Sequence, residues 1–166
     1  MKVEVINIGS ELLFNKINTN INLISKILMK YGIKISKCVI VGDKKEEIKE
    51  TFLNSLKKAD FIIITGGLGP TFDDLTRESI SESLDRKLIY DEKIWEEIKE
   101  KFKKRNITPP EINKKQAWII EGCKIIENKN GTAPGMLIEE KSKIILILPG
   151  PPNELKPMLE ESLKFL

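Results

Sequence analysis

The sequence predicts an α/β domain in which a mostly parallel sheet is covered by helices on both faces. Short apolar runs of strand length alternate with segments of helical periodicity, which is typical of βαβ units. Two of these runs, residues 61–64 and 144–148, are apolar throughout, as expected for strands buried on both faces. A chain of 166 residues with 40% hydrophobic residues can bury one sizeable core, so we expect a single domain over residues 1–166.

The first half of the chain predicts two strands, each followed by a helix. The strands cover residues 3–8 and 33–41. After the first strand comes a segment rich in turn formers, and then an apolar stripe at helical spacing that Gly32 ends. This stripe consists of Ile17, Ile21, Ile24, Leu28 and Tyr31. The core face of the second helix consists of Ile48, Phe52, Leu53 and Leu56.

The second half adds the buried strand at residues 61–64 and short strands that end in a possible hairpin. These strands cover residues 124–126, 136–140 and 144–148. Only the segment KSK separates the last two, so they predict a hairpin that gives the sheet one antiparallel member. Further helices are expected over residues 72–84, 91–104, 111–118 and 153–166.

The composition excludes several kinds of protein and of chemistry. The net charge is only +3 and the arginines are scattered, so the basic stripe of a nucleic-acid binder is missing. The chain has no histidine, which removes Ser-His-Asp and Cys-His catalysis and histidine general bases. The apolar start is short and carries Glu4, and no run approaches the length of about 20 residues that spans a membrane. We therefore expect a cytoplasmic protein that binds neither nucleic acid nor a membrane.

The two cysteines, Cys38 and Cys123, stand alone in apolar stretches. They lack the paired spacing of a structural zinc site. We expect two buried thiols in a reducing compartment.

The segment ITGGLGPTFDDLT, which follows the buried strand, predicts an anion site with a metal beside it. Gly66, Gly67 and Gly69 remove Cβ atoms where the backbone must bend or approach a ligand. Adjacent carboxylates at such a turn, here Asp73 and Asp74, repel each other unless a cation or hydrogen-bond donors compensate. Ligands of open α/β sheets usually bind beyond the carboxyl ends of the strands, where this turn is expected.

Simpler roles remain open for two of the acidic residues. Asp43 precedes a helix and has Glu46 three residues later, which fits a capping box, so it can be an N-cap only. Thr71 and Asp74 have the same spacing and also fit a capping box. Asp73 is less easily explained in this way.

Two further loops offer anion sites or rigid turns. The segment GTAPG, residues 131–135, brings backbone donors and the Thr132 hydroxyl into a glycine-bracketed loop, which can bind phosphate or form a tight hairpin turn. The segment PGPP, followed by Asn153 and Glu154, presents a free helix start to an anion or forms a rigid connection. Most of these loops follow strands, so we expect them to gather at one edge of the sheet.

Together the loops resemble a known family. The segments GSELL, NTN, VGD, ITGGLGPTFDDLT, NKKQA, NKNGTAPG and PGPPNELKPM are similar, in this order, to the N-terminal domain of competence/damage-inducible protein CinA. That domain belongs to the wider MogA/MoaB-like group of molybdopterin-binding domains. The resemblance covers residues 3–158 and implies a three-layer α/β/α fold with a mostly parallel mixed sheet. It also implies a homo-oligomer, either a dimer or a trimer.

The resemblance implies a function as well. For the CinA-like branch this is a divalent-metal-dependent pyrophosphatase that acts on ADP-ribose or a related nucleotide diphosphate. The catalytic and metal-holding residues would be Asp43, Asp73 and Asp74, with Mg²⁺ as the metal and Mn²⁺ or Co²⁺ fitting as well. The phosphate-binding or nucleotide-binding residues would be Gly66, Gly67, Gly69, Thr71, Lys115, Asn128, Gly131, Thr132, Gly135, Glu154, Glu11 and Asn20.

Two other functions use the same pocket. The wider group implies molybdopterin binding or adenylyl transfer in molybdenum cofactor biosynthesis, with molybdopterin as a ligand. A non-catalytic nucleotide-binding domain is a further alternative. The sequence also departs from the family: Asn15 stands where members often have glycine, and the chain ends without the C-terminal nicotinamide-mononucleotide deamidase domain of full-length CinA proteins. Deamidase activity is therefore not expected.

Overall fold

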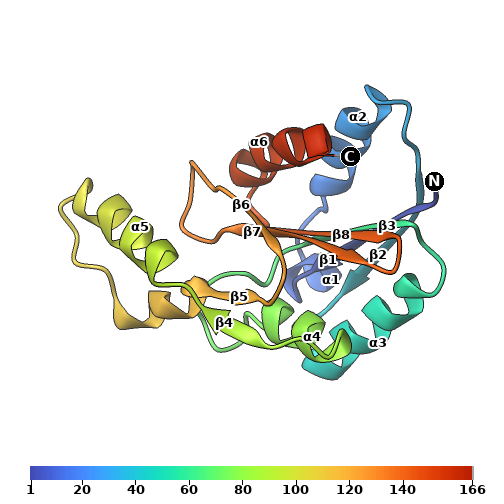
Figure 1. Ribbon diagram of the computed structural model, residues 1–166. Coiled ribbons are helices and arrows are strands. Elements are labelled where there is room, and N and C mark those ends of the chain that lie inside the picture. Colours follow the sequence, from blue (N-terminus) through green and yellow to red (C-terminus); the bar gives the residue numbers. More distant parts are fainter. Residues whose placement is uncertain (166) are drawn as a thin grey trace.

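The computed structural model describes residues 1–165, which form three layers with a six-stranded sheet between two layers of helices (Figure 1). The strand order is β2-β1-β3-β8-β7-β6. The strands of this sheet are β1 Val3–Ile8, β2 Ile35–Val41, β3 Phe61–Thr65, β6 Lys124–Ile126, β7 Gly135–Glu140 and β8 Lys143–Leu148. The helices are α1 Glu11–Phe14, α2 Asn20–Met29, α3 Lys45–Leu56, α4 Thr76–Ser83, α5 Glu92–Lys103 and α6 Pro152–Ser162, with 3₁₀ helices η1 Glu111–Ala117 and η2 Leu163–Phe165.

The sheet is mostly parallel, as predicted. Strands β2, β1, β3 and β8 pair in parallel, whereas β7 pairs antiparallel with both β8 and β6. The predicted hairpin of β7 and β8 is therefore confirmed. The carboxyl ends of the parallel strands lie at one edge, where the site of an open α/β sheet is expected.

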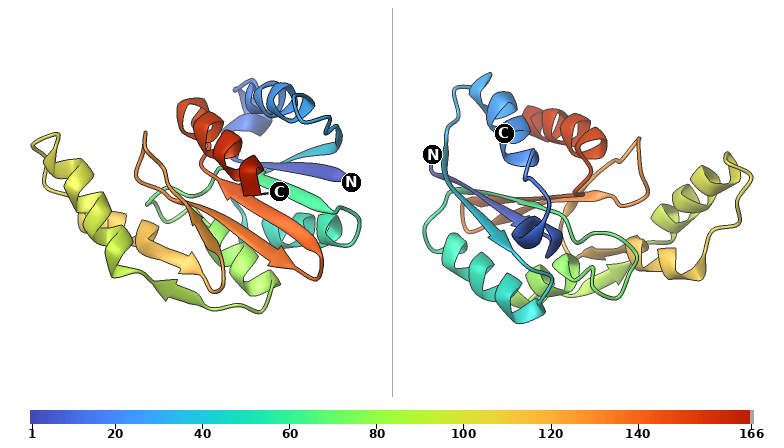
Figure 2. Two further views of the ribbon diagram at one scale, coloured as in Figure 1. Left: turned by 45° about the horizontal axis from the view of Figure 1, so that its top comes forward. Right: turned by 180° about the vertical axis from the view of Figure 1, so that it is seen from behind.

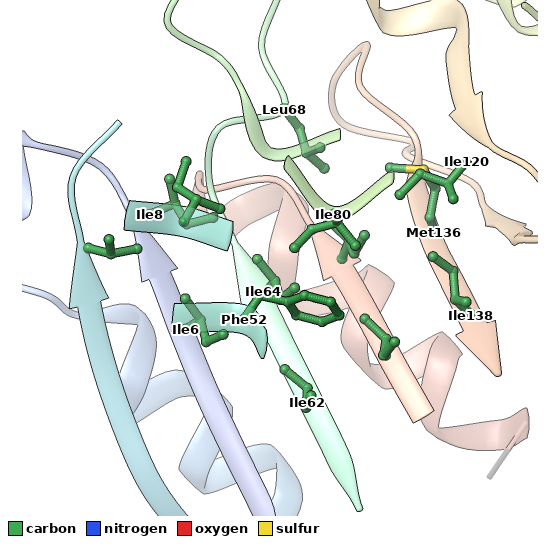
Figure 3. Close-up of a cluster of buried hydrophobic side chains, with 14 of the residues drawn as sticks. Ile6, Ile8, Phe52, Ile62, Ile64, Leu68, Ile80, Ile120, Met136 and Ile138 are labelled. Atoms are coloured by element: carbon green, nitrogen blue, oxygen red, sulfur yellow. The ribbon is translucent and has the colours of Figure 1, made fainter. Parts of the chain in front are cut away.

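Alternating side chains divide the core between the two faces of the sheet. On β1, Val3 and Val5 pack with α2 and α6, while Ile6 and Ile8 pack on the opposite face with α3 and α4. Figure 3 shows the second cluster, in which Phe52 of α3 lies over Ile62 and Ile64. Helices α2 and α6 cover one face and α3 and α4 cover the other, so the three-layer prediction is confirmed (Figures 1 and 2).

A side lobe extends from the main layers and was not predicted. Strands β4 (Leu88–Tyr90) and β5 (Trp118–Ile120) form a separate antiparallel pair beside α5 and η1. The predicted helix at residues 91–104 is confirmed as α5, and Asp91 caps it by accepting a hydrogen bond from the Ile94 N–H at 3.2 Å. The lobe has its own small core of Ile94, Trp95, Ile98 and Ala117. In Figure 2 it projects to the side, away from α2.

Two predicted helices begin later than expected. Helix α2 begins at Asn20, where the Asn18 side chain accepts a hydrogen bond from the Ile21 N–H, so Ile17 lies outside the helix and is 83% exposed. Helix α4 begins at Thr76 rather than residue 72. The reason is that Thr71 and Asp74 close a turn: the Asp74 carboxylate accepts from the Thr71 N–H at 2.9 Å. This pair is therefore not a helix cap.

Four other side chains and the end of one helix differ from expectation. Leu53 and Tyr31 are exposed, because they are rotated away from the buried stripes of their helices or lie beyond them. Cys38 is also exposed, since β2 is an edge strand. Cys123 is half-buried, and its burial raises the pKa of the thiol to about 11. Helix α6 ends at Ser162, and Leu166, the predicted end of that helix, lies outside the described residues.

Within residues 1–165, we find no helix whose length and apolar character would let it cross a membrane.

We predict that Gly66→Ala destabilises the protein much more than Gly32→Ala. Both glycines have positive φ angles, +94° and +72°. A Cβ on Gly66 would lie 2.2 Å from the Ile8 carbonyl oxygen, whereas a Cβ on Gly32 would meet nothing within 4 Å. Gly32→Ala should cost only the left-handed backbone term of about 1–2 kcal/mol, and Gly66→Ala at least about 3 kcal/mol. Urea unfolding measures both, and equal losses would contradict the close approach of β1 and β3.

Candidate active site

A cavity of about 760 Å³ opens at the carboxyl-terminal edge of the parallel strands. The loops after β1, β2, β3 and β8 line it, together with the loop between β6 and β7. Its volume lies in the range of pockets that bind nucleotide-sized ligands. The predicted site residues in its lining are Glu11, Asn20, Asp43, Gly66, Gly67, Gly69, Thr71, Asp73, Asp74, Gly131, Thr132 and Glu154. The structure therefore brings these residues together, while their roles remain predictions.

The glycine turn after β3 is fixed from behind by the start of α4. The Thr76 hydroxyl donates to the Gly66 carbonyl at 2.8 Å, and the Thr76 N–H donates to the Gly67 carbonyl at 3.2 Å. Gly67 has a φ of +64°, and a Cβ there would lie 2.2 Å from the Thr76 hydroxyl. Among the described residues, nothing accepts a hydrogen bond from the N–H groups of Gly67, Leu68 or Gly69. These donors line the cavity and are available to an anion.

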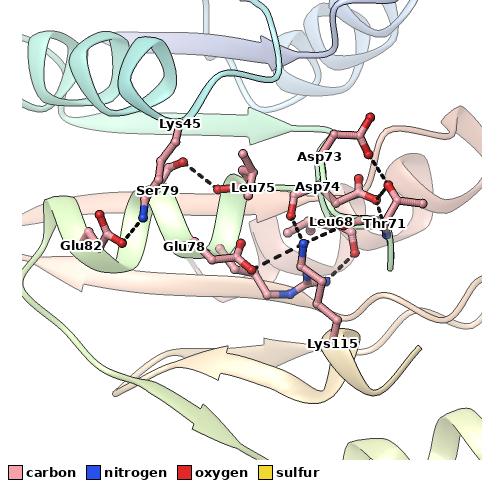
Figure 4. A network of polar contacts seen from close by, with 11 residues as sticks. Lys45, Leu68, Thr71, Asp73, Asp74, Leu75, Glu78, Ser79, Glu82 and Lys115 are labelled. Carbon is pink, nitrogen blue, oxygen red and sulfur yellow. Dashed lines mark hydrogen bonds and ion pairs between the residues drawn. The ribbon is translucent and has the colours of Figure 1, made fainter. Parts of the chain in front are cut away.

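The two adjacent carboxylates converge on one hydroxyl. The Thr71 hydroxyl lies within hydrogen-bonding distance of an Asp73 oxygen and at 2.6 Å from the Asp74 Oδ2 (Figure 4). A hydroxyl has one proton and can donate to only one of these oxygens. The Asp74 oxygen also accepts from the Thr71 N–H, so Asp73 is the less compensated carboxylate. Converging hard oxygen atoms of this kind suit a divalent cation.

Asp43 lies apart from this pair and does not cap α3. Its carboxylate accepts from the Ser10 N–H at 2.8 Å, and its own N–H donates to the Ser10 hydroxyl at 3.1 Å. It therefore joins the loops after β1 and β2, while Lys44 is the N-cap of α3 without a side-chain bond. Over residues 1–165, no three His, Cys, Asp or Glu side chains form a group that could hold a metal ion. The predicted set of three carboxylates is thus not assembled, although one or two carboxylates suffice for Mg²⁺ when phosphate oxygens complete its shell.

Two cations support the carboxylate loop from outside the cavity. The Lys115 ammonium donates to the carbonyls of Thr71 at 2.7 Å and Asp74 at 2.5 Å, and lies 3.5 Å from Glu78 (Figure 4). Arg77 is fully buried and donates to the Leu68 carbonyl. Burial lowers the pKa of Arg77 to about 10, and the nearby carboxylates oppose that shift. Lys115 is not part of the described cavity lining and holds the loop through its carbonyls, while its predicted phosphate contact stays a prediction.

The loop between β6 and β7 is shaped by Asn128. This buried side chain donates to the Ala133 carbonyl at 2.9 Å and to the Glu154 carboxylate at 2.7 Å. It therefore lies behind the cavity wall and connects the loop to the first turn of α6. A Cβ on Gly131 would lie 2.3 Å from the Glu154 carboxylate. The absence of a side chain at Gly131 therefore leaves room for Glu154 to lie against the loop. Gly135 begins β7 and packs against Met158 in the core.

Asn20 presents an unused acceptor. Its side-chain amide donates to the Gly150 carbonyl at 2.7 Å, which connects the start of α2 to the loop after β8. Its Oδ1 is buried and has no hydrogen-bond partner among the described residues. Asn20 lines the cavity, so this buried and unpaired oxygen lies close to the cavity wall.

The sequence did not reveal several residues of the cavity wall. Phe102 and Arg105, at the end of α5 and just beyond it, and Gln116 of η1 line the cavity from the side lobe. No local sequence pattern indicates that these residues line the cavity. They reach it because β4 pairs with β5 and the lobe thereby lies beside the carboxyl-terminal edge of the sheet. Arg105 appeared only as one of several scattered arginines.

Comparison with known proteins agrees with this architecture. Residues 4–166 match the family model described as a probable molybdopterin binding domain. A CinA-like protein from Endomicrobium trichonymphae is 45% identical over 174 residues, which covers 99% of this chain and 41% of the relative. A putative competence-damage inducible protein from Bacillus subtilis is 44% identical and is covered over 39% of its length. The chain thus spans about two fifths of these curated relatives.

Solved structures agree as well. The crystal structure of the protein CinA from Thermoplasma acidophilum matches 99% of this chain and 96% of that one, with 35% sequence identity and a TM-score of 0.89. The molybdopterin biosynthesis enzyme MoaB from Thermus thermophilus covers 99% of this chain at a TM-score of 0.67 and 19% identity, which shows a shared fold. The chain therefore belongs to the family of probable molybdopterin binding domains and, within it, to the CinA-like proteins.

Proposed function

We propose that this domain is a divalent-metal-dependent pyrophosphatase that hydrolyses ADP-ribose or a related nucleotide diphosphate. One observation carries the proposal: the converging Asp73 and Asp74 carboxylates share a cavity with two loops rich in free backbone donors. Backbone donors suit phosphate, and paired carboxylates suit a cation that is shared with phosphate oxygens. The combination matches the requirements of a diphosphate better than those of an uncharged ligand.

In this proposal the two glycine loops bind the diphosphate. The N–H groups of Gly67, Leu68 and Gly69 belong to one loop, and those of Gly131 and Thr132 belong to the other. Donors fixed in advance favour the charge that develops on the phosphate oxygens during hydrolysis. Mg²⁺, held by Asp73 and Asp74, would add charge neutralisation when it is bound.

The proposed reaction is an in-line attack by water. The water oxygen forms a bond to one phosphorus while the bridging P–O bond breaks, and the products are AMP and ribose 5-phosphate. The chain contains no histidine, so we assign the proton that water loses to a carboxylate, although a bound metal would also lower the pKa of that water. Asp43 lines the cavity apart from the Asp73–Asp74 pair and is our candidate for this proton acceptor.

We predict that Asp73→Asn lowers kcat/KM for ADP-ribose by at least about 100-fold. The amide oxygen can still accept from the Thr71 hydroxyl, so the loop keeps its shape while the charge is lost. AMP release is measured with Mg²⁺, Mn²⁺ or Co²⁺ and again with a chelator, which should abolish it in wild type. Asp85→Asn, an exposed carboxylate outside the cavity, is the matched control and should retain activity. A wild-type protein that releases no AMP with any of these metals rejects the hydrolase proposal.

We predict that Lys115→Ala weakens metal use more than substrate binding. The variant loses both hydrogen bonds to the carboxylate loop, so Asp73 and Asp74 should be held less firmly. We expect the Mg²⁺ concentration for half-maximal activity to rise by about 10- to 100-fold. Lys114→Ala is the control, since this neighbouring lysine pairs with Glu111 at 2.9 Å and does not reach the loop. A rise in KM for ADP-ribose alone would favour the direct phosphate contact that the sequence suggested.

Molybdopterin binding or adenylyl transfer is the second candidate, and the family match favours it. It would use the same cavity and the same anion loops. Thermal unfolding with molybdopterin and with ADP-ribose, with or without Mg²⁺, separates the candidates. A saturable rise in Tm with molybdopterin and no hydrolysis of ADP-ribose would reverse our ranking. A rise with ADP-ribose and no turnover would favour a non-catalytic nucleotide-binding domain.

A further inference from the structure

A second, smaller cavity lies beside the first, along the side lobe. It has a volume of about 310 Å³ and lies between the end of α5 and the loop that connects β6 to β7. Phe102, Arg105 and Thr132 are among the residues that line both cavities, so the two cavities share a wall. We call the smaller cavity the basic annex. None of the residues predicted as catalytic lines it.

The annex is strongly cationic. Lys101, Lys104, Arg105 and Lys129 line it, and Glu127 is the only acidic residue in its described lining. Such an excess of one sign inside a cavity concentrates the field and favours ligands of opposite charge. The chain as a whole has a net charge of only +3, so the positive charges are locally concentrated in the annex.

Among residues 1–165, three of these cations have no carboxylate partner. The Lys101 ammonium is engaged, because it donates to the Gly131 carbonyl at 2.9 Å and also to the Asn128 carbonyl. For Lys104, Arg105 and Lys129, no carboxylate within residues 1–165 lies within 4.0 Å. Other lysines of α5 behave differently: Lys99 lies 2.5 Å from Glu96 and Lys103 lies 3.8 Å from Glu100.

We propose that the basic annex binds a phosphomonoester on the ligand, in addition to the diphosphate bound by the glycine loops. This inference rests on the proposed function. It narrows the substrate class to nucleotide diphosphates that carry an additional phosphate as a monoester, separate from the diphosphate. A phosphomonoester carries about −1.5 to −2 charges and three acceptor oxygens, which match several unpaired cations. Arg105 lines both cavities, and its guanidinium can bind phosphate with two parallel hydrogen bonds.

The test compares three probes by calorimetry: ADP-ribose, its 2′-phosphate on the adenosine side, and its 1″-phosphate on the distal ribose. Wild type should bind one of the two phosphorylated probes at least about 10-fold more tightly than ADP-ribose, a difference of about 1.4 kcal/mol. The two probes also show which end of the ligand enters the annex. Equal binding of all three probes overturns the proposal.

Variants then locate the effect. In Lys104→Gln/Lys129→Gln, the affinity ratio between the phosphorylated probe and ADP-ribose should fall to near one. Lys99→Gln/Lys103→Gln removes the same number of charges from paired positions on α5 and should keep the ratio. If this affinity ratio falls equally in both double variants, the effect is a general one of charge, and the proposal that the annex binds the phosphomonoester is overturned.

The binding comparison is made with a chelator present, so it is independent of turnover. A preserved preference without ADP-ribose hydrolysis in Mg²⁺ rejects the pyrophosphatase alone. Hydrolysis of ADP-ribose without preferential binding of a phosphorylated probe rejects only the proposal for the annex. If no probe binds, with chelator or with Mg²⁺, both are rejected.

Discussion

The close approach of three strand ends at Gly66 is the constraint on which the rest of the site depends. The Gly66 N–H donates to the Leu148 carbonyl at the end of β8, and its Cα faces the Ile8 carbonyl at the end of β1 with no room for a side chain. Three parallel strands can therefore end side by side, and their loops diverge around one cavity. A larger residue at Gly66 would separate the floor of the cavity from the sheet that supports it. The loops after β1, β3 and β8 take their positions from this junction.

Electrostatics explains how two adjacent aspartates persist in the loop above that floor. Lys115 and Arg77 donate to backbone carbonyls of the loop rather than to the cavity-facing carboxylate oxygens. The positive charge of Arg77 attracts Asp74, and this attraction offsets part of the repulsion between the two adjacent carboxylates. The hydrogen bonds of Lys115 and Arg77 leave the carboxylate oxygens directed at the cavity and at Thr71. The loop is thus held in place while its negative charge stays available to a cation.

The sequence predicted the parts of the fold whose signals are local. The apolar runs of β1, β3 and β8 and the hairpin of β7 and β8 follow from composition and spacing, and the loops at their ends followed from topology. The capping pattern left an N-cap role open for Asp43, and the structure decides against it because the carboxylate accepts a hydrogen bond from the N–H of Ser10, a residue distant in the sequence. Strands β4 and β5 were missed because each is only three residues long and is stabilised by its distant partner. Phe102 and Arg105 entered the site through that pairing, so no local pattern indicated them.

The cavity wall consists of glycine loops from the core and side chains from the side lobe, and these two parts would contribute differently to ligand selection. Backbone donors of the two glycine loops recognise phosphate oxygens but carry no information about the rest of a ligand, since any phosphate offers the same acceptors. Nucleotide diphosphates and phosphorylated pterins would therefore engage these loops equally well. Selection between them has to come from side chains that reach the part of the ligand beyond its diphosphate. In this chain Asn20, Phe102 and Arg105 occupy such positions, and two of them belong to the side lobe. In the proposed function, the core of the fold supplies the phosphate-binding loops, and the lobe would select the compound that carries the phosphate.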